Sequence, residues 1–155
     1  MPLIKSGSKE ALAYCAGLVD GEGSISAAPS HHSALNYRVS LAITMCDING
    51  LKFVSNIFGG NIRKEKALTK SGKEIYSWAI YCRNAADALE QMLPYLQVKK
   101  SRAIKAIKLA RMMRDKKSQG LPIGSDEIVM RHEIAASIRS ENIASNGRLI
   151  KHASN

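Results

Sequence analysis

The stretch that decides the fold is residues 14–24, Tyr-Cys-Ala-Gly-Leu-Val-Asp-Gly-Glu-Gly-Ser. A helix is predicted to begin shortly before it, because Ser8 has the side chain of a helix N-cap and Glu10 places a carboxylate in the first turn. Gly21 is predicted to end the helix in a left-handed conformation. Because the helix is apolar nearly all round, we expect it to be buried on more than one side.

Length and composition indicate one globular domain. The chain has 155 residues, of which 45% are hydrophobic and 23% are charged. No apolar stretch approaches the roughly 20 residues of a membrane span, and residues 1–10 lack the apolar run of a secretory signal. Three cysteines without a CxxC spacing are typical of reduced thiols in an intracellular protein. We therefore expect an intracellular location, in a compartment the sequence does not specify, with no membrane partner and no organic cofactor.

The charge balance is strongly basic. The chain has 23 Lys and Arg residues against 13 Asp and Glu residues, a formal net charge of +10. Nine of these cations lie between Lys99 and Lys117, where the only acid is Asp115. Such an excess is typical of proteins that neutralise phosphates, with membrane surfaces and acidic partners as alternatives.

Hydrophobic periodicity predicts the order αββαββα followed by two more helices. Strands are predicted at residues 24–30, 38–45, 62–66 and 75–81, with a long loop at residues 31–36. After the first helix, further helices are predicted at residues 47–58, 84–93, 101–116 and 125–140. The fold class is therefore α+β, a four-stranded antiparallel sheet with helices on one face. We expect a single domain over residues 1–155, with a core unit of residues 8–117, a helical extension of residues 118–141 and a flexible tail of residues 142–155.

Strand alternation predicts which side chains face away from the helices. Tyr76, Trp78 and Ile80 make the better core, so the other parity faces outward. The open face should then carry Ser26, Ala28, Ser30, Arg38, Ser40, Thr44, Arg63, Glu65 and Ser77. This face could be simply solvated, and a slip of one residue in strand phase would invert the assignment.

Residues 15–23, Cys-Ala-Gly-Leu-Val-Asp-Gly-Glu-Gly, resemble the nine-residue signature of the LAGLIDADG homing endonucleases. Cys15 replaces the opening Leu, Gly21 the second Ala and Glu22 the final Asp. The predicted element order over residues 8–117 is also similar to the αββαββα unit of that family, in which the sheet forms a concave DNA-binding face.

The resemblance implies a site-specific homing endonuclease that hydrolyses phosphodiesters in both strands of a long pseudo-palindromic DNA target. It implies a divalent metal, Mg²⁺ or Mn²⁺, and short 3′ overhangs. Only one copy of the motif is present, which in this family implies a homodimer. Ala13, Ala16 and Gly17 leave one flank of the helix nearly bare, and with Asp20 they are the expected interface. An RNA-splicing maturase or a noncatalytic nucleic-acid-binding protein on the same scaffold remains the alternative.

The resemblance also implies the active-site residues. Glu22 is the expected metal ligand and a catalytic residue, and the carbonyl of Gly21 is the expected second ligand, which agrees with the oxygen ligands that Mg²⁺ prefers. We interpret Asp20 as structural, with metal ligation as the alternative. Asp47 is predicted to order water in the active site, although Asp is also an ordinary N-cap. Lys99 is predicted to stabilise charge on the phosphoryl group.

DNA contacts are expected from the open sheet face and from nearby lysines. Arg38 and Arg63 could bond to guanine edges, while the serines and Thr44 could bond directly or through water. Lys73 and Lys100 are expected to contact phosphates, and Lys100 also competes with Lys99 for the catalytic role.

Overall fold

The computed structural model of the chain describes residues 7–113 and 122–152, with side chains through Ser145. The elements are α1 (Lys9–Glu22), β1 (Gly23–Ser30), β2 (Ser33–Met45), α2 (Ile48–Phe58), β3 (Asn61–Leu68), β4 (Glu74–Tyr81), α3 (Cys82–Met92), α4 (Lys100–Met112) and α5 (Ser125–His152). This order confirms the predicted α+β arrangement. The predicted boundary at residue 117 lies outside the described residues.

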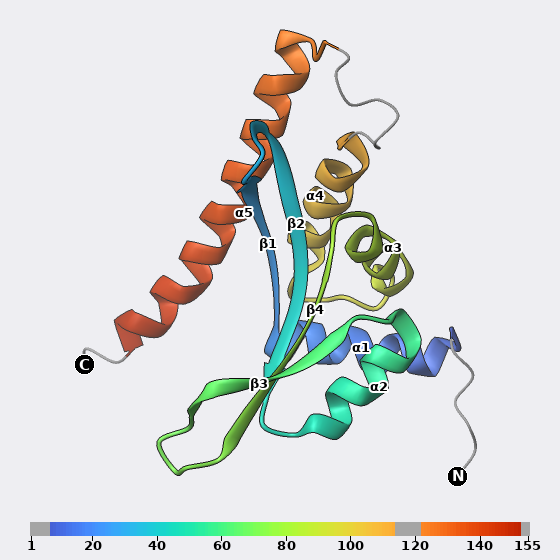
Figure 1. Cartoon of the computed structure of the whole chain (residues 1–155), viewed down its shortest axis with the longest axis vertical. Coiled ribbons are helices and arrows are strands. Elements are labelled where there is room, and N and C mark those ends of the chain that lie inside the picture. Colours follow the sequence, from blue (N-terminus) through green and yellow to red (C-terminus); the bar gives the residue numbers. More distant parts are fainter. Residues whose placement is uncertain (1–6, 114–121, 153–155) are drawn as a thin grey trace.

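The four strands form one antiparallel sheet in the order β1-β2-β4-β3. The β1–β2 hairpin and the β3–β4 hairpin extend from the body of the molecule in different directions, while α1 and α2 lie together near the end from which the β3–β4 hairpin projects (Figure 1). The long α5 runs beside β1, at the edge of the sheet (Figure 1). Among the described residues, one face of the sheet packs against helices and no helix covers the other face.

The hydrophobic core confirms the predicted strand phase. Val39, Leu41 and Ile43 of β2 are fully buried, whereas Arg38 and Thr44 on the opposite parity are exposed. The same parity holds in β4, where the indole of Trp78 is fully buried. Its Nε1 donates a hydrogen bond to the carbonyl of Gly59 over 2.7 Å, so the one polar atom of that ring is satisfied. Trp78 thus belongs to the core.

Two predicted boundaries near the motif are wrong. The helix α1 does not end at Gly21 in a left-handed conformation but continues to Glu22, with Gly23 in an extended conformation after it. The predicted loop of residues 31–36 is also too long, because β2 already begins at Ser33, which pairs with Ser30. An irregular register at Pro29 and Ser30 breaks the period of two there, so alternation could not reveal the extra strand residues.

The last helix is longer than predicted. It continues past residue 140 to His152, so residues 142–152 are helical where we expected a flexible tail. Ala135 and Ile138 pack into the core, and the side-chain amide of Asn142 donates to the carbonyl of Ile25 over 3.0 Å. β1 is an edge strand, and this bond gives one of its outward carbonyls a partner. The polar end of α5 is therefore tied to the sheet by contacts with residues that are distant in the sequence.

None of the helices in residues 7–113 and 122–152 combines the length and the apolar character that crossing a bilayer requires.

Arg131 connects α5 to the rest of the protein. Its side chain is fully buried and donates to the carbonyls of Leu35 and Met112, over 3.0 and 2.9 Å, and to Glu127 over 2.5 Å. Its Nε has no partner among the described residues. One guanidinium therefore joins the beginning of β2, the end of α4 and the first turns of α5.

Replacing Arg131 with Met should destabilise the fold by about 3 kcal/mol, because it removes the fully buried donor of the hydrogen bonds to Leu35, Met112 and Glu127. Urea unfolding measures this as a lower midpoint. The matched control is Arg139→Met, at an exposed position of the same helix, which should change the free energy of unfolding by no more than about 0.5 kcal/mol. Equal effects of the two substitutions would contradict the role of Arg131.

Candidate active site and nucleic-acid interface

The motif ends at a tight junction between α1 and β1. Gly23 donates its backbone N–H to the carbonyl of Val19 and turns at once into the strand. A Cβ on Gly23 would lie 2.6 Å from that carbonyl oxygen, closer than real Cβ atoms come, so glycine is required here. The junction leaves Glu22 as the last helical residue, with its side chain exposed.

Asp20 caps a different helix. Its carboxylate accepts hydrogen bonds from the backbone N–H groups of Gln97, Val98 and Lys99, over 2.7, 3.2 and 2.9 Å. These groups precede the first turn of α4, where a carboxylate is favoured by the helix dipole. Asp20 was expected at the dimer interface, but its oxygen atoms are used inside the protomer. This supports its structural interpretation over metal ligation.

Lys99 makes the reciprocal contact. Its ammonium donates to the carbonyls of Val19 and Asp20, each over 2.8 Å, at the C-terminal end of α1. Cations are favoured there by the same dipole. Burial lowers the pKa of Lys99, as does the nearby charge of Arg102, while the carboxylates of Asp20 and Glu22 act in the opposite direction. Lys99 is thus a buried cation held at the end of the motif helix.

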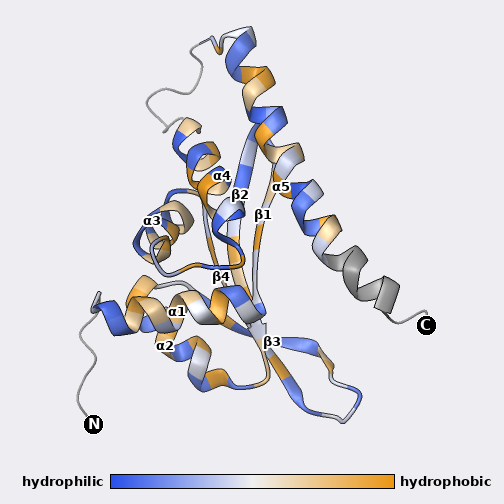
Figure 2. Cartoon of the chain, turned by 180° about the vertical axis from the view of Figure 1, so that it is seen from behind, coloured by the Kyte–Doolittle hydropathy of each residue, from blue (hydrophilic) through white to orange (hydrophobic). Residues whose placement is uncertain are grey.

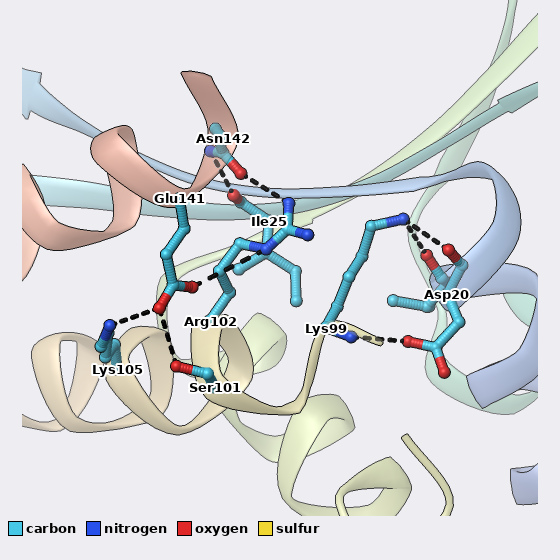
Figure 3. Close-up of polar contacts among 9 residues, drawn as sticks. Asp20, Ile25, Lys99, Ser101, Arg102, Lys105, Glu141 and Asn142 are labelled. Atoms are coloured by element: carbon cyan, nitrogen blue, oxygen red, sulfur yellow. Dashed lines mark hydrogen bonds and ion pairs between the residues drawn. The ribbon is translucent and has the colours of Figure 1, made fainter. Parts of the chain in front are cut away.

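A cleft of about 510 Å³ opens beside these contacts. Asp20, Gly21 and Lys99 line it from one side and Arg102 and Asn142 from the other. Figure 3 shows Lys99 and Arg102 side by side, with Asp20 beyond the lysine. The structure therefore brings together three of the predicted site residues.

Glu22 follows Gly21 directly and has no hydrogen bond or ion pair within the part of the chain that the structure describes. The two acids of the motif are therefore in opposite situations. The carboxylate of Asp20 is occupied by three donors from its own chain, whereas the carboxylate of Glu22 is free to bind a ligand.

Asp47 does not line the cleft of Lys99. It is the N-cap of α2, where its Oδ1 accepts from the backbone N–H of Asn49 over 2.8 Å. It lines a separate cleft together with Lys73, Glu74 and Tyr76. The structure thus shows the capping role and does not place Asp47 among the residues around Lys99.

The open face of the sheet carries the polar side chains that we predicted for it. Ser26 pairs with Ser40 across β1 and β2, and their hydroxyls lie 2.6 Å apart. In the next strands, Ser77 of β4 donates to Glu65 of β3. The predicted residues of this parity are Ser26, Ala28, Ser30, Arg38, Ser40, Thr44, Arg63, Glu65 and Ser77.

The two predicted lysines lie off the sheet. Lys73 is in the β3–β4 turn and Lys100 begins α4, and both are exposed. Most of the β3–β4 hairpin away from the body of the protein is hydrophilic (Figure 2).

Sequence reasoning missed two groups at this surface. Tyr81 shares the open face, and the guanidinium of Arg38 stacks 4.8 Å from its ring centroid. Strand alternation places Tyr81 on the same face as Ser77, so the sequence could have predicted the position of Tyr81. Arg102 and Asn142 could not have been paired in advance, because they are 40 residues apart and meet only through tertiary packing.

The predicted interface flank needs one correction. Ala16 is fully buried in the core of the protomer, because that side of α1 packs inward, so it cannot meet a second chain. Ala13 and Gly17 are exposed, and so is Gly21 further along the same side. A side chain at Gly17 or Gly21 would meet nothing within 4 Å.

No protein-family model and no curated protein matches the sequence. Solved structures do match it. The homing endonuclease I-CvuI in complex with its target has a TM-score of 0.63 at 23% identity, over 82% of this chain and 78% of that chain. The archaeal intron-encoded homing endonuclease I-Vdi141I complexed with DNA has a TM-score of 0.65 at 14% identity, over 84% and 82%. The LAGLIDADG homing endonuclease I-GzeII in complex with its DNA target has a TM-score of 0.64 at 16% identity, over 81% and 44%.

The chain has the LAGLIDADG homing-endonuclease fold. The segment that resembles the family signature forms the second half of α1, and Glu22 is its last helical residue, directly after Gly21 of the Lys99 cleft. At these identities the likeness concerns the fold, and the activity has to be argued from the site.

The two acids of the motif should respond differently to substitution. Asp20→Ala removes the acceptor of three backbone N–H groups and should lower the free energy of unfolding by about 2 kcal/mol. Glu22→Gln should change it by less than about 0.5 kcal/mol, because Glu22 is exposed and unpaired in the described part of the chain. Urea unfolding of both variants checks this. The assignment is wrong if Glu22→Gln is the more destabilising change.

Proposed function

We propose that this protein is a site-specific, metal-dependent endonuclease that cuts both strands of DNA as a homodimer. The observation that carries the proposal is the exposed, unpaired carboxylate of Glu22 at the end of the motif helix. Lys99 lies close enough for the charge of Glu22 to act on its pKa, and it lines the cleft at the same end of α1. Hydrolysis of a phosphodiester needs an oxygen ligand for a metal and positive charge for the phosphoryl group, and this helix end offers both.

The proposed substrate is double-stranded DNA, bound along the open sheet face. A formal net charge of +10 favours a polyanion. Arg38 and Arg63 project from that face and could bond to base edges, while Lys73 and Lys100 could contact phosphates. Two solved structures of this fold, I-CvuI and I-GzeII, hold their DNA targets.

Homodimer formation is proposed through the exposed flank of α1. Ala13, Gly17 and Gly21 present little side chain, so a second copy of α1 could approach closely about a two-fold axis. Such packing would bring the two Glu22 carboxylates together. The length comparison supports this, since the chain matches 44% of I-GzeII but 78% of I-CvuI, and only the longer protein has room for a second unit in one chain.

The donor set fits Mg²⁺ or Mn²⁺. Glu22 supplies an exposed carboxylate and Gly21 a backbone carbonyl, which are hard oxygen ligands. In residues 7–113 and 122–145 no cluster of three or more His, Cys, Asp or Glu side chains could hold a metal by itself. The other ligands would therefore come from DNA phosphates and from the partner chain. The bound metal would activate water and stabilise the leaving oxygen.

The residues of the chain have separate parts in the proposed reaction. Glu22 binds the metal at the dimer axis, and Lys99, held against the end of α1, contributes positive charge near the phosphoryl group. The open sheet face positions the duplex. The cut is proposed to leave short 3′ overhangs.

Glu22→Gln should abolish cleavage while DNA binding is retained. The wild-type protein is incubated with Mg²⁺ and a library of duplexes, and the sequences cut in both strands are identified. On such a target the variant should lose at least about 100-fold in cleavage rate. Glu10→Gln, an exposed acid in the first turn of the same helix, is the matched control and should cleave like the wild type. Binding without cutting by the wild type would indicate the noncatalytic alternative.

Gly17→Met should convert the dimer to a monomer without destabilising the protomer. The new side chain meets nothing within 4 Å in the single chain, but it would block close approach of a second α1. Sedimentation measures the change from twice the 16.9 kDa chain mass to a single chain mass. Ala136→Met, at an exposed position of α5, is the control and should leave the dimer intact. A wild-type monomer at micromolar concentration would refute this assembly.

A further inference from the structure

The cleft beside the motif helix has a second wall that the proposed nuclease site does not use. Arg102 of α4 forms that wall together with Asn142 and Ser145 of α5 and Ser24 of β1. Arg102 is only 8% exposed, yet it lines the cleft. Two of these four residues belong to α5, which lies outside the αββαββα unit.

The guanidinium of Arg102 is held in place by α5. Its Nη1 donates to Oδ1 of Asn142 over 2.8 Å, and its Nε lies 3.8 Å from the carboxylate of Glu141. Asn142 is itself fixed, because its amide donates to Ile25 at the edge of β1. The carboxylate of Glu141 also accepts hydrogen bonds from Ser101 and Lys105, over 2.7 and 2.5 Å. Its negative charge is therefore shared between Lys105 and Arg102. Figure 3 shows this network on one side of Arg102 and Lys99 on the other.

Several hydrogen-bond donors in the cleft have no partner within the described residues. They are the Nη2 of Arg102 and the hydroxyls of Ser24 and Ser145. Asp20, the acid of this lining, already accepts three backbone N–H groups. Two cations, Lys99 and Arg102, thus stand close together without an anion between them. An anion with several oxygen atoms would satisfy both the charges and the free donors.

We propose that this cleft binds one phosphate of the DNA backbone next to the cut, with Arg102 as the binding residue and Asn142 of α5 as the residue that positions it. The proposal rests on the proposed nuclease function for the identity of the polyanion. The bound phosphate is placed next to the cut because Gly21 lines the cleft and directly precedes Glu22. The C-terminal helix then acts in DNA binding through Arg102, in addition to covering the sheet edge.

The test is a binding measurement in the absence of divalent metal, so that it does not depend on cleavage. A duplex is selected by the wild-type protein from a random library. A series of copies is then made in which one phosphate at a time is replaced by a neutral methylphosphonate. We expect one position in each half-site where the neutral linkage weakens wild-type binding about tenfold or more but leaves Arg102→Gln unaffected. Arg102→Gln should also reduce the slope of log affinity against log salt concentration by about 0.9 for each phosphate that it no longer neutralises.

Three variants make the result specific. Arg111→Gln removes a charge from the far end of the same helix, where Arg111 pairs with Asp87 and Glu90, and should bind every duplex like the wild type. Arg102→Lys should keep the salt slope but lower the affinity, because lysine lacks the fork of the guanidinium. Asn142→Ala should likewise keep the salt slope. It should reduce the loss of affinity that the neutral linkage causes at the same phosphate. Urea unfolding identifies any variant that binds weakly because it misfolds. If Arg102→Gln misfolds, the results with Arg102→Lys and Asn142→Ala decide whether the proposal holds.

The outcomes separate the two proposals. If the wild type cuts its target but no phosphate shows the dependence on Arg102, the cleft proposal is overturned and the nuclease stands. If the dependence appears but nothing is cut, the phosphate site stands and the nuclease fails. If the wild type binds no duplex, both are overturned.

Discussion

The structure depends on a reciprocal capping contact between α1 and α4. Asp20, near the end of α1, accepts the backbone N–H groups that precede α4, and Lys99, just before α4, donates to the last carbonyls of α1. Each helix end thus receives the charge that its dipole favours, from a residue of the other helix. Because Lys99 is buried and Asp20 accepts three hydrogen bonds at once, the two contacts fix where α1 stops relative to α4, and with it the place of Glu22 and of the cleft.

This contact also separates the roles of two acids that differ little in sequence. Asp20 and Glu22 are two positions apart. Both are acids with the same charge, and the sequence does not show which of them has a partner. In the fold, Asp20 has three donors from its own chain, so it is part of the scaffold. Glu22 lies one residue before the strand begins and is exposed. An acid without a partner at the end of a rigid helix is suited to binding something outside the chain, whereas a satisfied acid is suited to holding the chain together.

Local patterns predicted much of this fold because they depend on neighbours in sequence. The caps at Ser8 and Asp47, the four strands and the parity of the sheet were all predictable, since a strand with one buried face must alternate. Prediction failed where distant contacts decide. Ala16 looked like part of a bare flank but faces the core, and the end of α5 looked frayed although Asn142 binds the edge of β1. Neither partner is near in sequence, so no local rule contains it.

By itself, the sequence determined the motif helix, the phase of the sheet and the excess of positive charge, because helix caps, side-chain periods and net charge are properties of short segments or of composition. Only the tertiary structure decided which motif acid is free, that Asp47 and Lys99 line separate clefts, and that Arg102 meets Asn142 beside the cleft of Lys99. These depend on how α1, α4 and α5 pack on one sheet. Packing is set by the fit of many side chains at once, and it brings together residues that the chain keeps far apart.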